Sequence, residues 1–410
     1  MAVLPRIAIV GAGPAGLTLA RLLQRHSIPC RIFERDADRF ARGQGGSLDL
    51  HEGSAQIAIK EAGLYDQFMK HARPEGEVLK IYNPENQILL SEGDGQGGRP
   101  SEFNGRPEID RSKLRELLLD SLEPSSVTWA RKLRRVQRNE VSGVTDLYFG
   151  NEKDEEKEEG FDLVVGGDGG WSKVRQALTS QQPVYSGVGG LDLRLSDIDK
   201  RNPRLAARVG PGMCLTLGES RGLMAQRNGD GSVRVYAFVR QPEEEYSHLA
   251  AEIATNPASV KQKMLDQFYS DWHEEAQSLV LNADDEIYLR PMYMLPVGLT
   301  WETKPGVTVI GDAAHLMTPF AGVGVNVAME DALELSREIR TGQDAGEWTS
   351  QTALRQSLAQ AIQRYEKTMW ARAEENAQAT WMYLGLFFNP RGGHAMIEHF
   401  EKEKAKEAGH

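Results

Sequence analysis

Three glycines near the start of the chain have the spacing of a phosphate-binding turn. An apolar run over residues 7–10 leads into Gly11, Gly13 and Gly16, and an apolar helical pattern follows directly. Gly11 would permit the tight turn, Gly13 would let the backbone approach a pyrophosphate, and Gly16 would let the helix pack on the strand. The free amides and the dipole of that helix, with Ala15 in its first turn, favour negative charge. The pattern predicts a dinucleotide site.

An acidic residue stands where a ribose-binding acid is expected. A second apolar run, residues 30–33, ends at Glu34, about 20 residues after the middle glycine, which suits hydrogen bonds to ribose hydroxyls. The alternative is an ordinary glycine-rich turn. Strand, helix and acid together favour the binding site.

Two further acids follow glycines at the ends of apolar runs. Asp168 stands between two glycines after residues 161–165, and Asp312 follows a glycine after residues 307–310. The carboxyl ends of parallel strands line the ligand crevice of an open sheet, so we expect these acids to converge with the glycine turn. There they could accept hydrogen bonds from ligand hydroxyls. The alternative is that both acids only cap the helices that follow.

The elements that would position these residues indicate an α/β fold with an inserted domain. We expect a nucleotide-binding domain over residues 1–180 that returns over 296–340. Alternating patterns over residues 181–295 predict an antiparallel-sheet substrate domain, to which residues 76–104 could add strands. A long helix over residues 341–388 would bridge the two.

Four smaller features complete this prediction. Residues 171–175 would open a helix, and the acidic run 152–159 would be a solvated hairpin tip. Residues 381–388 form an apolar stretch that we interpret as core, with a surface anchor as the alternative. The charged tail beyond Pro390 should be loose.

Composition excludes several classes of protein. The chain has 410 residues and a net charge of −11, which argues against nucleic acid or an anionic membrane as the main partner. Its two cysteines cannot form a disulfide framework or a metal site, which suits a reducing cytosol. The first predicted strand leaves no room for a signal peptide, and residues 381–388 are too few for the ~20 of a spanning helix. We expect a cytoplasmic monomer.

The motifs together resemble the single-component FAD-dependent aromatic hydroxylases, which implies a Rossmann-like FAD-binding domain of the GR2-type hydroxylase fold. The matching residues are Gly11-x-Gly13-x-x-Gly16 with Glu34-Arg35, then Gly167-Asp168-Gly169 with Ser172, Val174 and Arg175, then Gly311-Asp312-Ala313-Ala314-His315 with Pro319 and Gly322-x-Gly324-x-Asn326. Residues 33–36, 45–51, 171–175 and 311–320 are similar to the tetracycline-inactivating Tet(X)-type monooxygenases.

The resemblance implies FAD as cofactor and NADPH or NADH as cosubstrate. Glu34 would hold the adenosine ribose, Arg35 the adenine and Asp312 the ribityl–pyrophosphate region, and the helix from Gly324 would face the flavin N1–C2=O edge. Asp168 belongs to a segment linked in such enzymes to FAD and NAD(P)H. The implied cofactor-binding residues are Gly11, Gly13, Ala15, Gly16, Glu34, Arg35, Asp49, Leu50, Arg111, Asp168, Asp312, Pro319, Gly322, Gly324, Val325 and Asn326.

The implied reaction is hydroxylation of a polycyclic phenol or enol by O₂ through a flavin C4a-hydroperoxide. No side chain is needed as a nucleophile, so we name no catalytic acid or base, and we interpret His315 as structural. Asp192, Met224, Arg234 and Phe320 are candidate substrate contacts. Asp192 and Arg234 could bind a zwitterion such as a tetracycline, or could only pair with each other.

The residues are also compatible with other functions. Val323 stands where the tetracycline enzymes usually have glutamine, and Asp192 and Arg234 replace their tetracycline-contacting residues by approximate alignment. A general phenol or secondary-metabolite hydroxylase, or a flavin-binding protein without turnover, would also fit. A flavin halogenase is disfavoured because no two tryptophans stand two residues apart.

Overall fold

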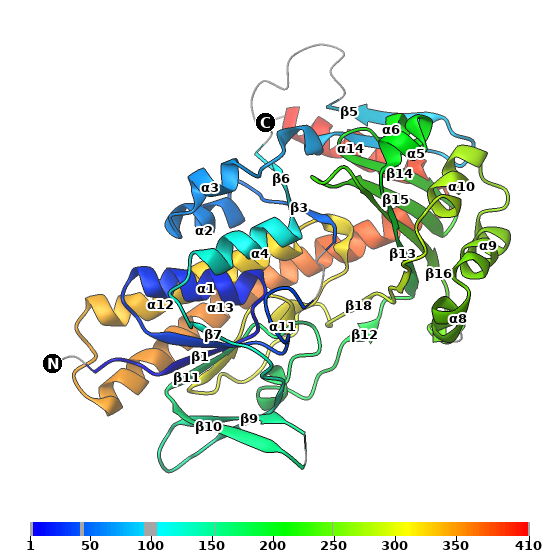
Figure 1. The fold of residues 1–410 in the computed structure, drawn as a ribbon. Helices are drawn as coiled ribbons and strands as arrows, with labels where there is room; N and C mark the ends of the chain where they lie inside the picture. Colours follow the sequence, from blue (N-terminus) through cyan, green and yellow to red (C-terminus); the bar gives the residue numbers. More distant parts are fainter. Residues whose placement is uncertain (1–2, 42–44, 94–104, 152, 248, 409–410) are drawn as a thin grey trace.

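Two large sheets of different type organise the molecule. The computed structural model describes residues 3–41, 45–93, 105–151, 153–247 and 249–408 (Figure 1). A parallel sheet forms one half, and a mostly antiparallel sheet with its own covering helices forms the other (Figure 1). The arrangement is the α/β fold with a second sheet that the residue pattern indicates.

The first sheet has five parallel strands in the order β19-β11-β1-β2-β7. These strands are β1 (Ile7–Val10), β2 (Cys30–Phe33), β7 (Val127–Thr128), β11 (Leu163–Gly166) and β19 (Val307–Val309). β1, β11 and β19 are buried throughout, because other elements cover both faces of a parallel sheet and such strands read as continuous apolar runs.

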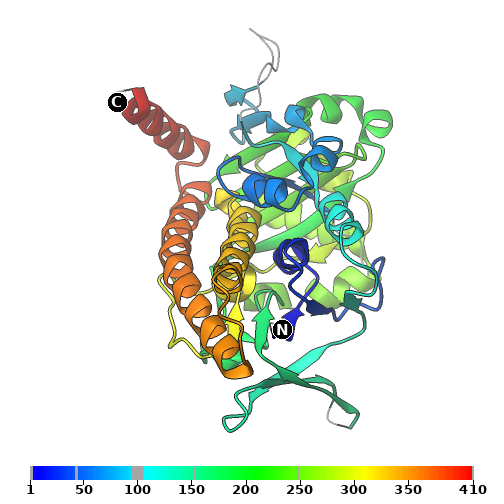
Figure 2. The same ribbon diagram turned by 90° about the vertical axis from the view of Figure 1, so that its left-hand side faces the viewer.

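Helices cover this sheet and connect it to the rest of the molecule. α1 (Pro14–Arg25) packs against α12 (Gly324–Asp344). α12 in turn packs against the long helix α13 (Gln351–Phe387). Figure 2 shows α13 along one flank of the molecule. Leu354, Leu358, Ile362, Tyr365 and Met369 form its buried stripe. α4 (Arg111–Asp120) lies beside α1, and α2 (Ala55–Glu61) contacts α12.

A small antiparallel sheet projects from the parallel one (Figure 1). It contains β8 (Leu133–Arg138), β9 (Thr145–Gly150) and β10 (Glu155–Phe161). The prediction that residues 152–159 form a hairpin tip is therefore wrong for most of that run, which is β10; residue 152 lies outside the described part. Its acidic side chains pair with arginines of β2 and β8, as in Arg31–Glu158 at 2.8 Å, and these ion pairs allow a charged strand.

The second large sheet has seven strands in the order β17-β13-β16-β15-β14-β4-β5, antiparallel except for the parallel pair β14–β4. They are β4 (Leu79–Tyr82), β5 (Ile88–Glu92), β13 (Val188–Leu195), β14 (Met213–Gly218), β15 (Arg221–Arg227), β16 (Val233–Arg240) and β17 (Tyr288–Leu289). Two strands thus come from residues 76–92; residues 94–104 lie outside the described part.

The two faces of this sheet have different roles. Its outer face carries Leu191, Leu223 and Val235, which pack against the helices α6 (Pro203–Val209), α9 (Pro257–Phe268) and α10 (Glu274–Leu281). Its inner face carries Leu215 and Phe238 and packs with the end of α13. Period-two alternation along each strand produces this division.

Shorter elements complete the fold. They are β3 (Ser47–Asp49) paired with β6 (Glu108–Asp110), β12 (Val184–Tyr185) paired with β18 (Tyr293–Met294), α3 (Tyr65–Met69), α5 (Ile198–Arg201), α7 (Glu244–Ser247), α8 (Leu249–Thr255), α11 (Asp312–His315), α14 (Gly393–Ala408), and the 3₁₀ turns η1 (Pro74–Glu77), η2 (Arg175–Ala177) and η3 (Pro319–Ala321).

Two expectations near the helix ends are wrong. Residues 171–175 do not open an α-helix; only the 3₁₀ turn η2 forms. The tail beyond Pro390 is not loose, because it forms α14, whose Met396 joins the core cluster of the inner sheet face (Figure 2). The apolar stretch 381–388 lies in and just beyond α13, with Leu384 buried and Trp381 exposed. Within the described residues, no helix is both long and apolar enough to cross a membrane.

Candidate functional site

The glycine turn after β1 is built by close backbone approach. Gly11 has a φ of +103°, and a Cβ on it would lie 2.3 Å from the carbonyl oxygen of Gly167. A Cβ on Gly16 would lie 2.2 Å from the carbonyl oxygen of Gly11. By contrast, a Cβ on Gly13 would meet nothing within 4 Å. Gly11 and Gly16 are thus required by the fold, whereas Gly13 borders open space at the start of α1.

Glu34 organises the same turn from the end of β2. Its carboxylate accepts hydrogen bonds from the Ala12 N–H at 2.6 Å and the Asp36 N–H at 3.0 Å, and the residue is buried. A carboxylate has about four acceptor positions, so these bonds leave capacity for ribose hydroxyls. Arg35 beside it is exposed, and Ala15 is buried in the first turn of α1.

The Asp168 carboxylate caps the turn that follows it. It accepts hydrogen bonds from the Ser172 hydroxyl at 2.5 Å and the Lys173 N–H at 2.7 Å. Burial raises the pKa of Asp168, and these hydrogen bonds oppose the rise. These bonds hold the turn over residues 172–174, and the segment that follows is the 3₁₀ turn η2 rather than the α-helix of the capping alternative. Arg175 fastens the segment by donating to the Ala313 carbonyl at 2.9 Å.

Asp312 begins α11 beyond the end of β19. Surrounding protein raises the pKa of its carboxyl, and the charges of His315 and Arg111 oppose that rise. Yet the residue has an exposed surface, the combination expected of a side chain that lines a hollow. Of the sequence-predicted acids, Asp312 is the one whose side chain is exposed.

A buried charged network holds the Asp312 loop. Asp331 of α12 accepts from the Gly311 N–H at 2.8 Å, lies 2.6 Å from Nε2 of His315, and accepts from Arg372 of α13 at 2.8 Å. Burial works against a charged imidazole, but Asp331 outweighs it and raises the pKa of His315. His315 thus acts in holding the loop.

The N-terminus of α12 points its first amides into the same region. Gly324 and Gly322 are exposed, Val325 is half-buried, and a Cβ on Gly324 would meet nothing within 4 Å. The first amides of a helix have no intrahelical partner and favour negative charge. Pro319, at the start of η3, is exposed as well.

The Asn326 side chain serves the neighbouring strand. Its amide donates to the Asp49 carbonyl at 2.9 Å and accepts from the His51 N–H at 2.7 Å. The Asn326 side chain is buried and already hydrogen-bonded, so only the backbone amide of Asn326 remains for a ligand. Leu50 is buried as well. The Asp49 carboxylate lies 2.8 Å from Nε2 of His51 and would lie 3.6 Å from a Cβ on Gly322.

Arg111 connects the two halves at the beginning of α4. Its N–H donates to the Gly46 carbonyl at 3.1 Å, and its side chain is exposed. A Cβ on Gly46 would lie 3.3 Å from the Tyr236 hydroxyl of β16. Burial raises the pKa of both Tyr236 and Asp312, and the charge of Arg111 opposes that rise. The cofactor-side loops therefore meet the inner face of the second sheet here.

The candidate substrate contacts share that inner face. Met224 is half-buried, and Phe320 of η3 packs on Phe238, with ring centroids 6.0 Å apart. Asp192 is 1% exposed and ion-paired to both Arg234 and Arg290, the latter at 2.8 Å. Asp192 and Arg234 therefore face inward and pair with each other, and with Arg290 the cluster carries a net charge of +1.

Three residues escaped the sequence analysis. Tyr236 lies between Arg234 and Phe238 on β16, and period-two alternation could have revealed it. Arg290 follows β17, and Arg115 lies one turn after Arg111. No local motif marks either, because each acts through contacts with distant segments.

The arrangement fits an FAD. Gly13 and Gly324 border open space, Asp312 offers an accessible carboxylate, and the α1 and α12 N-termini present unpaired amides to anionic groups. Among the described residues, no group of three His, Cys, Asp or Glu could hold a metal ion.

Comparisons with known proteins agree with this assignment. Residues 5–287 and 296–363 match the FAD binding domain family. The monooxygenase asqM of Emericella nidulans is 33% identical over 94% of this chain and 96% of its own, and the monooxygenase penA of Penicillium thymicola is 32% identical with the same coverage.

Solved structures share the fold at low identity. Klebsiella pneumoniae HpxO complexed with FAD and uric acid has a TM-score of 0.73 at 17% identity, covering 97% of this chain and 92% of that one. The tetracycline destructase Tet(51) has a TM-score of 0.66 at 18% identity, covering 99% and 95%. With the glycine turn, the accessible acid and the GR2-type hydroxylase fold in place, the chain belongs to the FAD binding domain family and is an FAD-dependent monooxygenase.

Proposed function

We propose that this enzyme uses NADPH or NADH and O₂ to hydroxylate a polycyclic, phenol- or enol-bearing substrate. The observation that carries this proposal is the meeting of Tyr236 with Gly46 and Arg111 on the cofactor side. Met224 is the cross-strand partner of Tyr236, and both residues are only partly buried. An aromatic and apolar wall beside the flavin loops suits a flat ring system with few polar groups.

The residues of the chain would bind, orient and shield the reacting groups. Bound FAD supplies the oxygen-activating chemistry. The amides of Gly324 and Val325 would stabilise negative charge that develops on the ring edge facing α12. Phe238, Phe320 and Phe387 form an apolar cluster that would keep water out of the reaction space.

The charged residues of the wall favour an acidic group over an ammonium. Asp192 pairs with both Arg234 and Arg290, so the three side chains together carry a net charge of +1, and an ammonium would find no unpaired carboxylate among them. The guanidinium N–H groups that do not contact Asp192 could donate to a substrate carbonyl or enolate. A neutral or weakly acidic ring system would therefore suit this wall at least as well as a zwitterion.

Tetracyclines remain the named substrates to test first. The motif similarity over residues 45–51 and 311–320 supports them, and the fold shared with Tet(51) is compatible with them. A secondary-metabolite hydroxylase acting on another polycyclic phenol is the second candidate, because the relatives that match along nearly the whole chain, asqM and penA, are monooxygenases whose names specify no tetracycline.

A substrate panel tests the proposal. The purified enzyme with NADPH and O₂ is incubated with tetracycline, a fused-ring phenol and a simple phenol, and products are scored by mass spectrometry for one added oxygen. We expect NADPH consumption to rise with a polycyclic substrate and to match the product formed. Oxygenation of the simple phenol alone would contradict the proposal, and tetracycline loss without an added oxygen would indicate peroxide damage.

A further inference from the structure

Side chains hold the two peptide units on either side of Ala12, in the middle of the glycine turn. The Ala12 N–H, in the Gly11–Ala12 unit, donates to the Glu34 carboxylate at 2.6 Å. The Ala12 carbonyl oxygen, in the Ala12–Gly13 unit, accepts from Nε of Arg115 at 3.2 Å. Because a trans peptide unit is planar and its N–H points opposite to its C=O, the bond from Arg115 also sets the direction of the Gly13 N–H before any ligand arrives. The next residue is Gly13, which borders the open space of the site.

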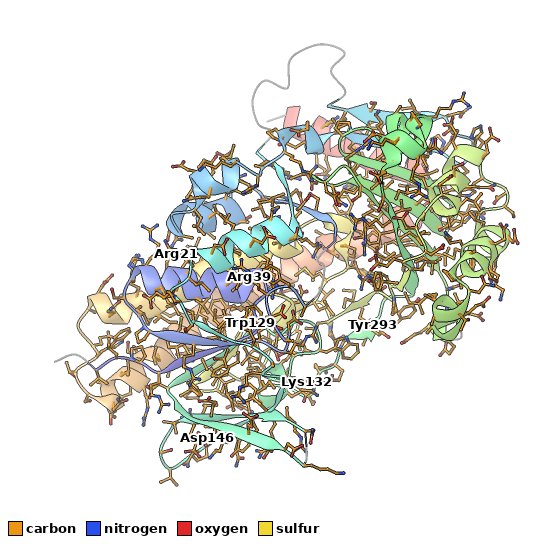
Figure 3. The ribbon with its side chains drawn as sticks, in the orientation of Figure 1. Arg21, Arg39, Trp129, Lys132, Asp146 and Tyr293 are labelled. Atoms are coloured by element: carbon orange, nitrogen blue, oxygen red, sulfur yellow. The ribbon has the colours of Figure 1, made fainter. Side chains whose placement is uncertain are left out.

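Arg115 also reaches the loop that follows Glu34. Its Nη1 donates to the Arg39 carbonyl at 2.8 Å, and its Nη2 lies 3.6 Å from the Asp36 carboxylate. Its guanidinium carbon lies 5.5 Å from the ring centroid of Trp129, within cation–π range. Figure 3 labels Arg39 and Trp129 in this region. Arg115 is 4% exposed, so these contacts offset the cost of burying its charge.

One face of α4 serves both ends of the site. Arg111 and Arg115 are four residues apart, which places them on one side of the helix about 6 Å apart along its axis. Arg111 lies at the Gly46 end, near the inner face of the second sheet. Arg115 lies at the Ala12 end, beside the loop that carries Arg35.

We propose that Arg115 is the positioning residue for the adenosine half of the FAD site. It would fix the Ala12–Gly13 peptide unit so that the Gly13 amide faces the pyrophosphate, and would fasten residues 36–39 so that Glu34 and Arg35 meet the adenosine. The proposal rests on FAD binding and is independent of the substrate, because flavin binding by the apoprotein is what tests it.

The test compares two arginines that bind similar partners. Arg115→Met keeps the aliphatic bulk and removes the guanidinium. The control is Arg21→Met on α1, since Arg21 also donates to two carbonyls, those of Ala62 at 3.1 Å and Ser121 at 2.7 Å, away from the turn (Figure 3). Apoprotein is titrated with FAD, with ADP as a probe of the adenosine half, and with FMN as a probe of the flavin half.

We expect Arg115→Met to weaken FAD and ADP by roughly ten- to a hundredfold, the effect of losing a charged hydrogen-bond donor, and to leave FMN affinity as in the wild type. Arg21→Met should leave all three affinities unchanged. Equal losses for FMN and ADP, or wild-type FAD affinity, would overturn the proposal.

Arg115→Lys keeps the test decisive if the methionine variant does not fold. Its single ammonium cannot reach the Ala12 and Arg39 carbonyls with two separate nitrogens. We expect a smaller loss of FAD and ADP affinity, again with FMN unchanged. Full retention of ADP affinity in Arg115→Lys, or a loss shared by FMN, would show that the residue serves stability alone.

Discussion

The cofactor half and the substrate sheet build their sites from different parts of the chain. In the cofactor half the backbone forms the surface: Gly11 lies against Gly167, and helix amides at Gly324 are unpaired. In the substrate sheet, side chains from separate strands form it, as when Asp192 joins Arg234 and Arg290. A site formed by close backbone is disrupted when a substitution adds a side-chain atom. A site formed by charged side chains is disrupted when a substitution removes one of the paired groups.

The strongest test of the backbone side compares two glycines. Gly11→Ala should abolish FAD content and cost ~4–6 kcal/mol of unfolding free energy, since strain at positive φ adds to overlap with Gly167. Gly13→Ala should fold normally, because its Cβ meets nothing, yet lose FAD since the cofactor needs that space. Thermal melts of the apoproteins and flavin content after purification measure both. Equal stability of the two variants would contradict the distinction.

The matching test of the side-chain side removes the shared acid. Asp192→Asn leaves Arg234 and Arg290 without their buried carboxylate and should cost about 3–5 kcal/mol of unfolding free energy. FAD affinity should change little, since the glycine turn lies in the other half. The control is Asp230→Asn, which breaks an exposed pair with Arg194 and should cost at most ~1 kcal/mol. Denaturant unfolding measures the free energy of unfolding of both variants. Similar losses for Asp192→Asn and Asp230→Asn would contradict a stabilising role of the buried Asp192 cluster.

The contact between the halves should be sensitive to pH. Glu108 of β6 accepts a hydrogen bond from Gln226 of β15, at 3.1 Å, and burial raises the pKa of Glu108 to about 7. Hydrogen bonds from Ser47 and Gln226 and the charge of Arg73 oppose the rise, while the charge of Asp49 adds to it.

The sign of this effect follows from the raised pKa. The unfolded chain ionises Glu108 near pH 4.5 and the folded chain near pH 7, so stability falls as pH rises through that window. Glu108→Gln should therefore gain stability relative to the wild type between pH 5 and pH 8, by up to about 3 kcal/mol. The exposed Glu140→Gln is the control, and a difference that stays constant with pH would refute the prediction.

The smallest predicted effect concerns one accessible acid. Asp312→Ala should weaken FAD by ~1.5–3 kcal/mol, roughly ten- to a hundredfold, because ligand hydroxyls lose their acceptor. Glu34→Ala should lower the affinity as well. Fluorescence titration of the apoproteins measures both, with the exposed Asp344→Ala as control. Unchanged affinity in both variants would remove these acids from the site.

The sequence predicted most of the cofactor side because its features are local. Gly11, Gly13 and Gly16 lie close together in the chain, and Asp312 lies just beyond the end of β19. Asn326 shows the limit of such reasoning: the motif places it near the start of α12, but its side chain binds the strand end at residues 49–51. Sequence spacing locates a backbone but does not show which neighbour a side chain selects.

The substrate side was less predictable since cross-strand neighbours are far apart in the chain. Asp192 and Arg234 were named, but whether they paired, and on which face, depended on the register of β13 with β16. A one-residue shift in that register would turn every side chain of the shifted strand to the opposite face.

The tail was also less predictable. Its charge pattern suggested looseness, whereas α14 forms because Met396 packs on the inner sheet face.

The sequence by itself determined the parallel sheet, the glycine turn, the acids at the strand ends and the presence of a second sheet, because short-range sterics and periodicity dictate them. Only the tertiary structure decided that Glu34 and Arg115 hold the two peptide units on either side of Ala12, that Asp331 fastens the Asp312 loop, and that Arg290 completes the Asp192 cluster. Those contacts join segments far apart in the chain, and only packing of the two halves brings them within hydrogen-bonding distance.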